Sequence, residues 1–240
     1  MKQFKHILFD LDGTLLALDF QEFVQTYFQL LGKKMAELGL DPKLALDAVW
    51  QGTKAMIEND GSATNEQTFW SVFAPAVGKE RAELEPLLAS FYCDEFHQIR
   101  SVLREERNLR QMIDGLKAKG YTVSLATNPV FPKEAVQTRL SWLGLTEEDF
   151  SLVTSYENSS YCKPNLGYFQ QVLAAGGFSA EECLMVGNNI EDDMTAKELG
   201  LSVYLVTDLL ENPKNGRVEA YPHGDFQQLQ GFFEALPPIQ

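Results

Sequence analysis

The stretch HILFDLDGT, residues 6–14, decides how this chain folds. From His6 it runs through an apolar segment of strand length that stops abruptly at Asp10. An apolar run without polar alternation is typical of a strand buried on both faces, as in a parallel sheet covered by helices on each side. Gly13 permits a turn that a β-carbon would hinder. The stretch therefore predicts a buried first strand followed by an acidic turn.

Similar apolar runs recur along the chain, at 121–126, 151–155, 183–186 and 202–206, of which 151–155 is the weakest. Helix-like segments alternate with them, at 108–119, 133–143, 165–175 and 191–199. Alternation of buried strands with helices of this length is the pattern of a parallel α/β sheet. We therefore predict a doubly wound, Rossmann-like parallel-sheet core.

The residues between the first two strands have a different character, with several amphipathic helices and no convincing strand. Apolar side chains recur at three- and four-residue steps from Phe20 to Leu38, which gives one apolar stripe. Asp41, followed by a proline, is a good helix start. We expect an inserted α-helical cap domain and a core in two pieces: 17–99 for the cap, and 1–16 with 100–240 for the core.

Composition narrows the classes of partner. The 240 residues include 20 Lys and Arg against 34 Asp and Glu, a formal net charge of −14. Nucleic-acid binding needs clustered Lys and Arg, and a membrane span needs ~18 apolar residues, so neither partner is expected. Three cysteines without CxxC spacing fit a reducing compartment. We expect a cytoplasmic monomer or small homo-oligomer.

Two acids, Asp10 and Asp12, follow the first predicted strand directly. Ligands of open α/β sheets bind at the carboxyl ends of the strands. A carboxylate there can act as a nucleophile or metal ligand, and its neighbour as an acid or base. The chain has no HExxH, GxxxxGK[ST] or GxGxxG motif, which argues against a histidine zinc site and the usual nucleotide fingerprints.

The residues DLDGT after an apolar strand resemble the first motif of the haloacid dehalogenase superfamily, most of whose members are phosphatases. The later motifs of that family have matches here in chain order. Thr127 ends the next core strand, Lys163 precedes a helix, and GNNIEDD at 187–193 closes a further strand. The resemblance extends from Phe4 to about Asp208, and the helical segment stands where one class of the family inserts its cap.

This resemblance implies a Mg²⁺-dependent phosphatase for a small phosphorylated metabolite. Asp10 would attack phosphorus and form an aspartyl-phosphate. Asp12 would protonate the leaving oxygen and then deprotonate water, for which its pKa should exceed that of an exposed Asp. Thr127 would donate a hydrogen bond to the phosphoryl group, and Lys163 would neutralise charge. Backbone N–H groups would add substrate-binding donors at Leu11, Gly13 and Asn128.

The resemblance also implies how the metal is held. Mg²⁺ would bridge Asp10 and the phosphate, with the Asp12 backbone carbonyl and one group of the fourth motif as further ligands. Most family members have an Asp directly after the glycine of that motif, where this chain has Asn188. Either Asn188 is a weaker ligand, or Asp193, and in second place Asp192, supplies the carboxylate.

Three other functions stay open. A phosphomutase of the same family would pass the phosphoryl group to a sugar instead of water. A catalytically weak binding or regulatory member has Asn188 as its only support. A 2-haloacid dehalogenase ranks last, because that branch generally lacks the second acid, which here is Asp12.

Overall fold

The computed structural model describes residues 4–105 and 107–239 and contains a five-stranded parallel sheet with the order β2-β1-β3-β4-β5. Residues 1–3, 106 and 240 of the expected core lie outside the described residues. The strands are β1 (His6–Phe9), β2 (Thr122–Leu125), β3 (Cys183–Gly187), β4 (Ser202–Val206) and β5 (His223–Gly224). The strand order reverses next to β1 and β3, which is where doubly wound sheets bind ligands.

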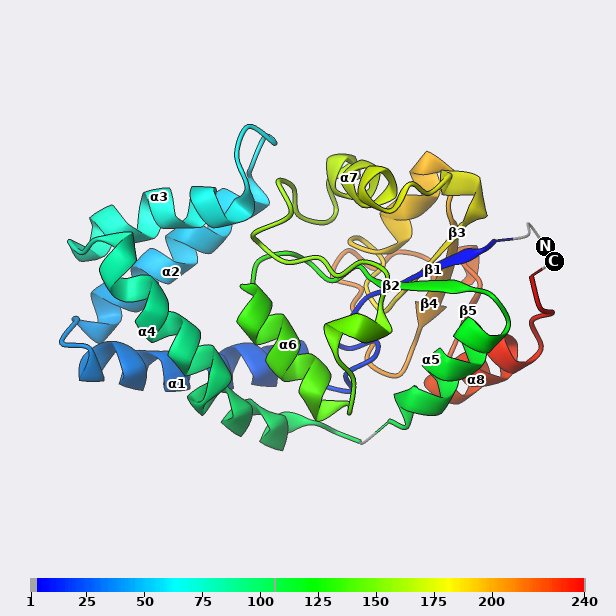
Figure 1. The fold of residues 1–240 in the computed structure, drawn as a ribbon, viewed down its shortest axis with the longest axis horizontal. Helices are drawn as coiled ribbons and strands as arrows, with labels where there is room; N and C mark the ends of the chain where they lie inside the picture. Colours follow the sequence, from blue (N-terminus) through cyan, green and yellow to red (C-terminus); the bar gives the residue numbers. More distant parts are fainter. Residues whose placement is uncertain (1–3, 106, 240) are drawn as a thin grey trace.

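Helices cover both faces of the sheet, with α5 (Leu109–Ala118) and α8 (Phe226–Glu234) on one face and α7 (Leu166–Gly176) on the other (Figure 1). Ile7 and Phe9 of β1 belong to the hydrophobic cluster that includes α5 and α8. Leu8, which lies between them, belongs to the cluster that includes α7. Successive side chains of β1 thus point to opposite, equally buried faces. The predicted doubly wound α/β fold is confirmed.

Two predicted elements differ from the expectation. The run 151–155 lies beside β2 and exchanges three backbone hydrogen bonds with it, but it is too short to form a full strand and makes an isolated bridge between Leu125 and Val153. The helix expected at 191–199 is a short 3₁₀ helix, η4 (Met194–Leu199). The side-chain oxygen of Asn189 accepts the N–H groups of residues 191 and 192, both at 2.9 Å, and this turn replaces the first helical turn.

Four α-helices follow β1 and lie together at the end of the molecule away from the chain termini (Figure 1). They are α1 (Phe20–Glu37), α2 (Pro42–Ile57), α3 (Asn65–Val77) and α4 (Arg81–Cys93), and residues 20–93 are here called the four-helix segment. The carboxylate of Asp41 accepts the Leu44 N–H at 3.0 Å and so caps α2 as predicted. Thr64 and Gln67 form a reciprocal capping box at α3.

The two connections between the four-helix segment and the sheet run side by side. Leu18 and Leu103 form an antiparallel bridge, and the Arg104 N–H donates to the Ala17 carbonyl at 2.7 Å. The return passes through η1 (Glu95–Val102), and α6 (Lys133–Trp142) packs against both α4 and η1. Three short 3₁₀ helices complete the elements: η2 (Glu147–Asp149), η3 (Ala180–Glu182) and η5 (Val218–Ala220). Within the described ranges, no helix has the length and apolar character that a membrane span requires.

Candidate active site

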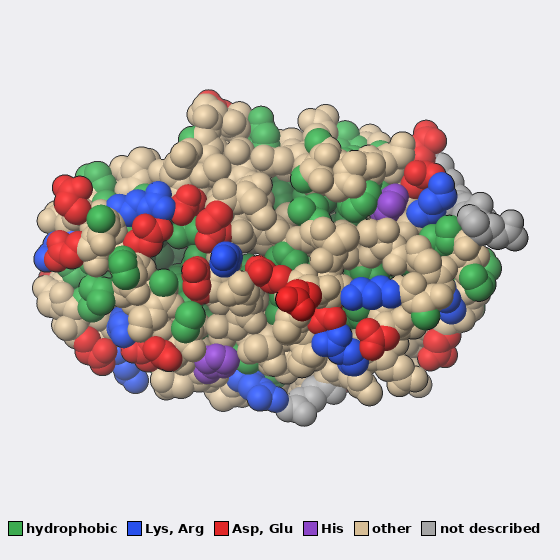
Figure 2. Space-filling model, in the orientation of Figure 1, with side chains coloured by type: hydrophobic (Ala, Val, Ile, Leu, Met, Phe, Trp, Pro, Cys, Tyr) green, Lys and Arg blue, Asp and Glu red, His purple; other side chains and the backbone are tan. Residues whose placement is uncertain are grey.

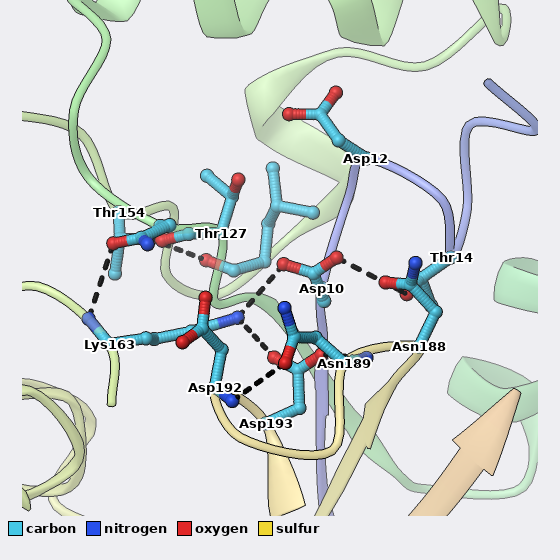
Figure 3. Close-up of polar contacts among 12 residues, drawn as sticks. Asp10, Asp12, Thr14, Thr127, Thr154, Lys163, Asn188, Asn189, Asp192 and Asp193 are labelled. Atoms are coloured by element: carbon cyan, nitrogen blue, oxygen red, sulfur yellow. Dashed lines mark hydrogen bonds and ion pairs between the residues drawn. The ribbon is translucent and has the colours of Figure 1, made fainter. Parts of the chain in front are cut away.

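The carboxyl ends of β1, β2 and β3 bring the predicted site residues to one edge of the sheet. Phe9 at the end of β1 is in register with Leu125 of β2 and Val186 of β3. The segments that follow these strands therefore leave the sheet at the same level. They carry Asp10, Thr127 and Asn188, which Figure 3 shows around one point.

Lys163 is buried and lies between two carboxylates (Figure 3). Its Nζ donates to Asp10 Oδ1 at 2.8 Å and to Asp193 Oδ1 at 2.6 Å. Burial by itself would lower the pKa of Lys163, but the charges of Asp10 and Asp193 outweigh it and raise that pKa above its usual value. The second oxygen of Asp193 accepts the Asn189 N–H at 3.0 Å. Lys163 is therefore a fixed positive charge beside Asp10.

Thr14 and Asn188 lie on the other side of Asp10. The Thr14 hydroxyl is 3.2 Å from Asp10 Oδ2 and 3.1 Å from Asn188 Oδ1. The Asn188 amide nitrogen donates to the Leu209 carbonyl at 2.7 Å, which keeps the amide oxygen turned toward Thr14. Gly13 has a φ of 80°, and a β-carbon there would lie 2.2 Å from the Asn188 amide nitrogen. The turn therefore requires glycine for both its conformation and its close approach to Asn188.

The oxygen atoms beside Asp10 have the chemistry of a magnesium site. Asp10 Oδ2 and Asn188 Oδ1 flank the same hydroxyl, and Asp192 lines the same cavity without an ion pair among the described residues. Mg²⁺ binds oxygen, commonly through one or two carboxylates and several waters. In residues 4–105 and 107–239, no group of three or more His, Cys, Asp or Glu could hold a metal. The residues therefore fit Mg²⁺ only as a mixed set that includes the amide of Asn188.

Asp12 points away from Lys163 (Figure 3). It pairs instead with Arg139 of α6. Its Oδ2 accepts a hydrogen bond from Arg139 Nη1, whereas its Oδ1 is buried without a partner in the described part of the chain. Arg139 is fully buried, and its guanidinium lies 4.7 Å from the centre of the Phe131 ring. Burial raises the pKa of Asp12, and the charge of Arg139 offsets only part of that rise.

The loop after β2 is held by hydrogen bonds to its backbone and side chains. The Thr127 carbonyl accepts the hydroxyls of Thr154 at 2.8 Å and Tyr168 at 2.9 Å, and the Asn128 side-chain oxygen accepts the Lys163 N–H at 3.2 Å. Thr127 and Asn128 both line the cavity above Asp10.

The backbone donors predicted in the first turn have different surroundings. The N–H of Gly13 already donates to the Leu16 carbonyl at 2.8 Å, because the turn closes on itself there. A phosphate could therefore receive that hydrogen bond only if the turn opened. For the N–H groups of Leu11 and Asn128, the described residues offer no backbone partner.

Sequence reasoning missed Thr14, Arg139 and Glu211. Thr14 belongs to the quoted DLDGT stretch, and Arg139 stands one turn after Ala135 on the buried face of α6, where a charge is unusual. Glu211 lies in the loop after β4, accepts the Asn189 amide at 2.9 Å and lines the cavity. Burial raises its pKa to about 7. No local pattern marks Glu211, since only the chain's return past Asn189 places it at the site.

Asp10, Asp12 and Lys163 lie at one end of a cavity of about 610 Å³ that extends into the four-helix segment. Figure 2 shows apolar side chains at the surface of that segment, among interspersed acidic and basic ones. Asp10, bound by the buried Lys163, therefore lies at the edge where doubly wound sheets bind their ligands.

The chain belongs to the haloacid dehalogenase-like hydrolase family, whose model matches residues 7–206. It is thus an enzyme of the hydrolase class. Over 218 residues it is 28% identical to the glyceraldehyde 3-phosphate phosphatase of Methanothermobacter thermautotrophicus, covering 90% of this chain and 91% of that protein. It is 27% identical over 206 residues to the phosphoglycolate phosphatase of Aliivibrio fischeri, covering 85% and 84% of the two chains.

A solved structure is similar over its whole length. The HAD phosphatase from Thermococcus onnurineus matches with a TM-score of 0.59 and 19% identity, and the match covers 98% of this chain and 100% of that one. At this identity the likeness shows the fold alone. It agrees with the parallel sheet and flanking helices described above.

Proposed function

We propose that this enzyme is a Mg²⁺-dependent phosphatase that acts on a phosphorylated metabolite through an aspartyl-phosphate. One observation carries the proposal: Asp10 has one oxygen held by Lys163 and the other beside Thr14, while Asp12 on the same turn has a raised pKa. The different surroundings of the two carboxylates therefore suit Asp10 to act as the nucleophile and Asp12 to act as the acid–base group. Curated relatives that are named as phosphatases support the choice of substrate class.

In the first step, an oxygen of Asp10 forms a bond to phosphorus while the bond from phosphorus to the leaving oxygen breaks. Lys163 and the Thr127 hydroxyl bind the charged phosphoryl oxygens. Asp12 donates its proton to the leaving oxygen. In this structure Arg139 binds Oδ2 and Oδ1 is buried, so the Asp12 carboxyl would turn toward the cavity to reach the leaving oxygen.

In the second step, water attacks phosphorus and the bond to Asp10 breaks. Asp12, now ionised, accepts the proton of that water and returns to its starting state. Arg139 stabilises Asp12 between the two steps, since it is the cation that contacts the carboxylate directly. We therefore assign Arg139 as a positioning residue for Asp12.

Mg²⁺, when bound, would supply positive charge that offsets the negative charge of the phosphoryl group. Asp10, Asn188 and the Asp12 backbone carbonyl would hold it, with Asp192 contributing directly or through water. Asp193 fits this role less well than Asn188, because Lys163 and the Asn189 N–H already occupy its two oxygens. We assign Asp193 to the support of Lys163 instead.

We propose further that residues 17–99 act as a cap on a core made of 1–16 and 100–240. The two connecting segments that pair at Leu18 and Leu103 would form the hinge, because both can bend at the same place. Closure would shield Asp10 from bulk water. Three free cysteines, Cys93, Cys162 and Cys183, support a location in the reducing cytoplasm.

Hydrolysis of p-nitrophenyl phosphate tests this function. We expect p-nitrophenol release that needs Mg²⁺ and that Asp10→Asn abolishes, with the exposed Asp114→Asn as a control that retains activity. No release from any phosphate ester would contradict the proposal in favour of a binding protein. Activity only with a bisphosphorylated sugar would indicate a mutase, and halide release from 2-haloacids would indicate a dehalogenase.

A further inference from the structure

The cavity above Asp10 is larger than a phosphoryl group on a short carbon chain requires. Its volume of about 610 Å³ lies within the range of about 300–1,000 Å³ found for pockets that bind small organic ligands. It runs from Asp10 and Lys163 into the four-helix segment, where α1 and α2 supply much of the wall. Space on this scale suits a ligand with a sizeable organic part.

Most of the wall formed by the four-helix segment is apolar. Its inner part includes six half-buried or buried side chains: Val24, Phe28, Leu31, Val49, Phe69 and Trp70. Phe20, Trp50 and Ile57 also line the cavity, yet their exposed fractions are 50%, 58% and 50%. Exposed apolar side chains that border a cavity gain from contact with an apolar ligand, because water is released from both surfaces.

Positive charge is scarce among the residues that line the cavity. Among the described residues that line it, the cations are Lys163 and Lys133. Lys163 is held between Asp10 and Asp193. Lys133 is an exposed residue at the start of α6, where water screens its charge. The other buried cation near the site, Arg139, does not line the cavity and is paired with Asp12, so a second acidic group on a substrate would meet no unpaired buried cation among the described lining residues.

Carboxylates, in contrast, stand on several sides of the cavity. Glu66 and Glu85 line one wall and are paired with Arg81, which does not itself line it. Glu134 and Glu157 line the cavity beside Lys133. A carboxylate on the organic part of a substrate would therefore meet like charges, which is unfavourable in a partly desolvated site.

We infer that the preferred substrate is a phosphate monoester of an uncharged, apolar alcohol, with a hydrocarbon or aromatic body, and not a short ester that carries a second acid. This inference rests on the proposed phosphatase function. The phosphoryl group would lie at Asp10 and Lys163, and the organic part would lie against Val24, Phe28 and Leu31 of α1. Residues of α1 thus determine specificity.

A panel of esters of primary alcohols tests this, because their leaving oxygens have similar reactivity. We would measure kcat/KM with Mg²⁺ for ethyl, hexyl and benzyl phosphate, glycerol 3-phosphate and phosphoglycolate. Hexyl and benzyl phosphate are expected to exceed ethyl phosphate at least tenfold, since each buried methylene group is worth about fourfold. Phosphoglycolate is expected to be the poorest substrate.

Two variants of α1 add a test of the site. Val24→Arg places a cation in the apolar wall, and it should raise kcat/KM for phosphoglycolate and lower it for hexyl phosphate, each at least fivefold. Gln25→Arg is the matched control, because Gln25 is exposed and lines a separate hollow with Ser101 and Arg104. It should leave the order of the panel unchanged.

The outcomes are separable. If the wild-type enzyme hydrolyses phosphoglycolate as well as or better than the apolar esters, the inference is wrong while the phosphatase function stands. If no ester is hydrolysed, the phosphatase function itself is wrong. An unchanged preference in folded Val24→Arg would contradict the placement of the organic part against α1.

Discussion

Replacing Arg139 with methionine tests the assigned support of Asp12. Methionine keeps an apolar stem against Phe131 but removes the charge and the hydrogen bonds, so Asp12 loses the cation that contacts its Oδ2. Removing one partner of a buried ion pair costs about 3–5 kcal/mol. The Asp12 side chain retains 17% exposure, so water can replace part of the lost contact. We therefore expect a loss of about 2 kcal/mol in the free energy of unfolding.

The loss should depend on pH in a defined direction. Without Arg139 the pKa of Asp12 in the folded protein rises further above its unfolded value. The folded protein then binds the Asp12 proton more tightly than the unfolded chain does, so its stability falls as the pH rises and Asp12 ionises. The variant's deficit should therefore be greatest at neutral pH and shrink as the pH falls toward the ordinary Asp value of about 3.9. Denaturant unfolding at several pH values measures it. Arg104→Met is the control, because Arg104 is exposed and should cost less than about 0.5 kcal/mol.

Kinetics separate positioning from bulk stability. Arg139→Met should lower kcat about 10- to 100-fold for alkyl phosphates, whose leaving oxygen needs a proton, and much less for p-nitrophenyl phosphate, whose leaving group does not. In an Asp12→Asn background the Arg139 change should have little further kinetic effect. Equal losses on both esters, or additive effects in the double variant, would refute the reasoning.

Three further predictions concern the same site and one ion pair. Asn188→Asp adds a carboxylate to the metal side of the site and should increase the apparent Mg²⁺ affinity at least fivefold in an activity titration, whereas an unchanged affinity would exclude Asn188 as a ligand. Gly13→Ala should cost about 1–3 kcal/mol and abolish turnover through its clash with Asn188. Gly39→Ala, with a similar positive φ but no neighbour within 4 Å, should cost stability alone. Asp149→Asn removes the negative charge and one of the two oxygens that accept the hydrogen bonds from Arg110, which lower the pKa of Asp149. The substitution should lower the free energy of unfolding by about 1 kcal/mol at pH 7. Chemical denaturation at several pH values should show this difference disappear as the pH falls through the lowered pKa of Asp149.

Much of the fold could be predicted from short stretches of sequence. A buried parallel strand is recognised by a continuous apolar run, and a helix start by its capping residue, each within a few residues. The apolar run ending at Asp10 predicted β1, and its two faces proved equally buried. Asp41 predicted the start of α2. The run 151–155 pairs with β2 as an edge segment through three backbone hydrogen bonds, but the ladder is too short to count as more than the bridge between Leu125 and Val153.

The sequence by itself predicted that Asp10, Thr127 and the fourth motif, each at the end of a predicted strand, would gather at one edge of a parallel sheet, because parallel strands align their carboxyl ends. The family resemblance added Lys163 to them. Only the tertiary structure decided how those groups are partnered. It assigned Asp193 to Lys163, turned the Asn188 oxygen toward Thr14, and brought Arg139 from α6 to Asp12. It also enclosed an apolar cavity above the acids. Such contacts join residues far apart in the chain, so no local spacing can specify them.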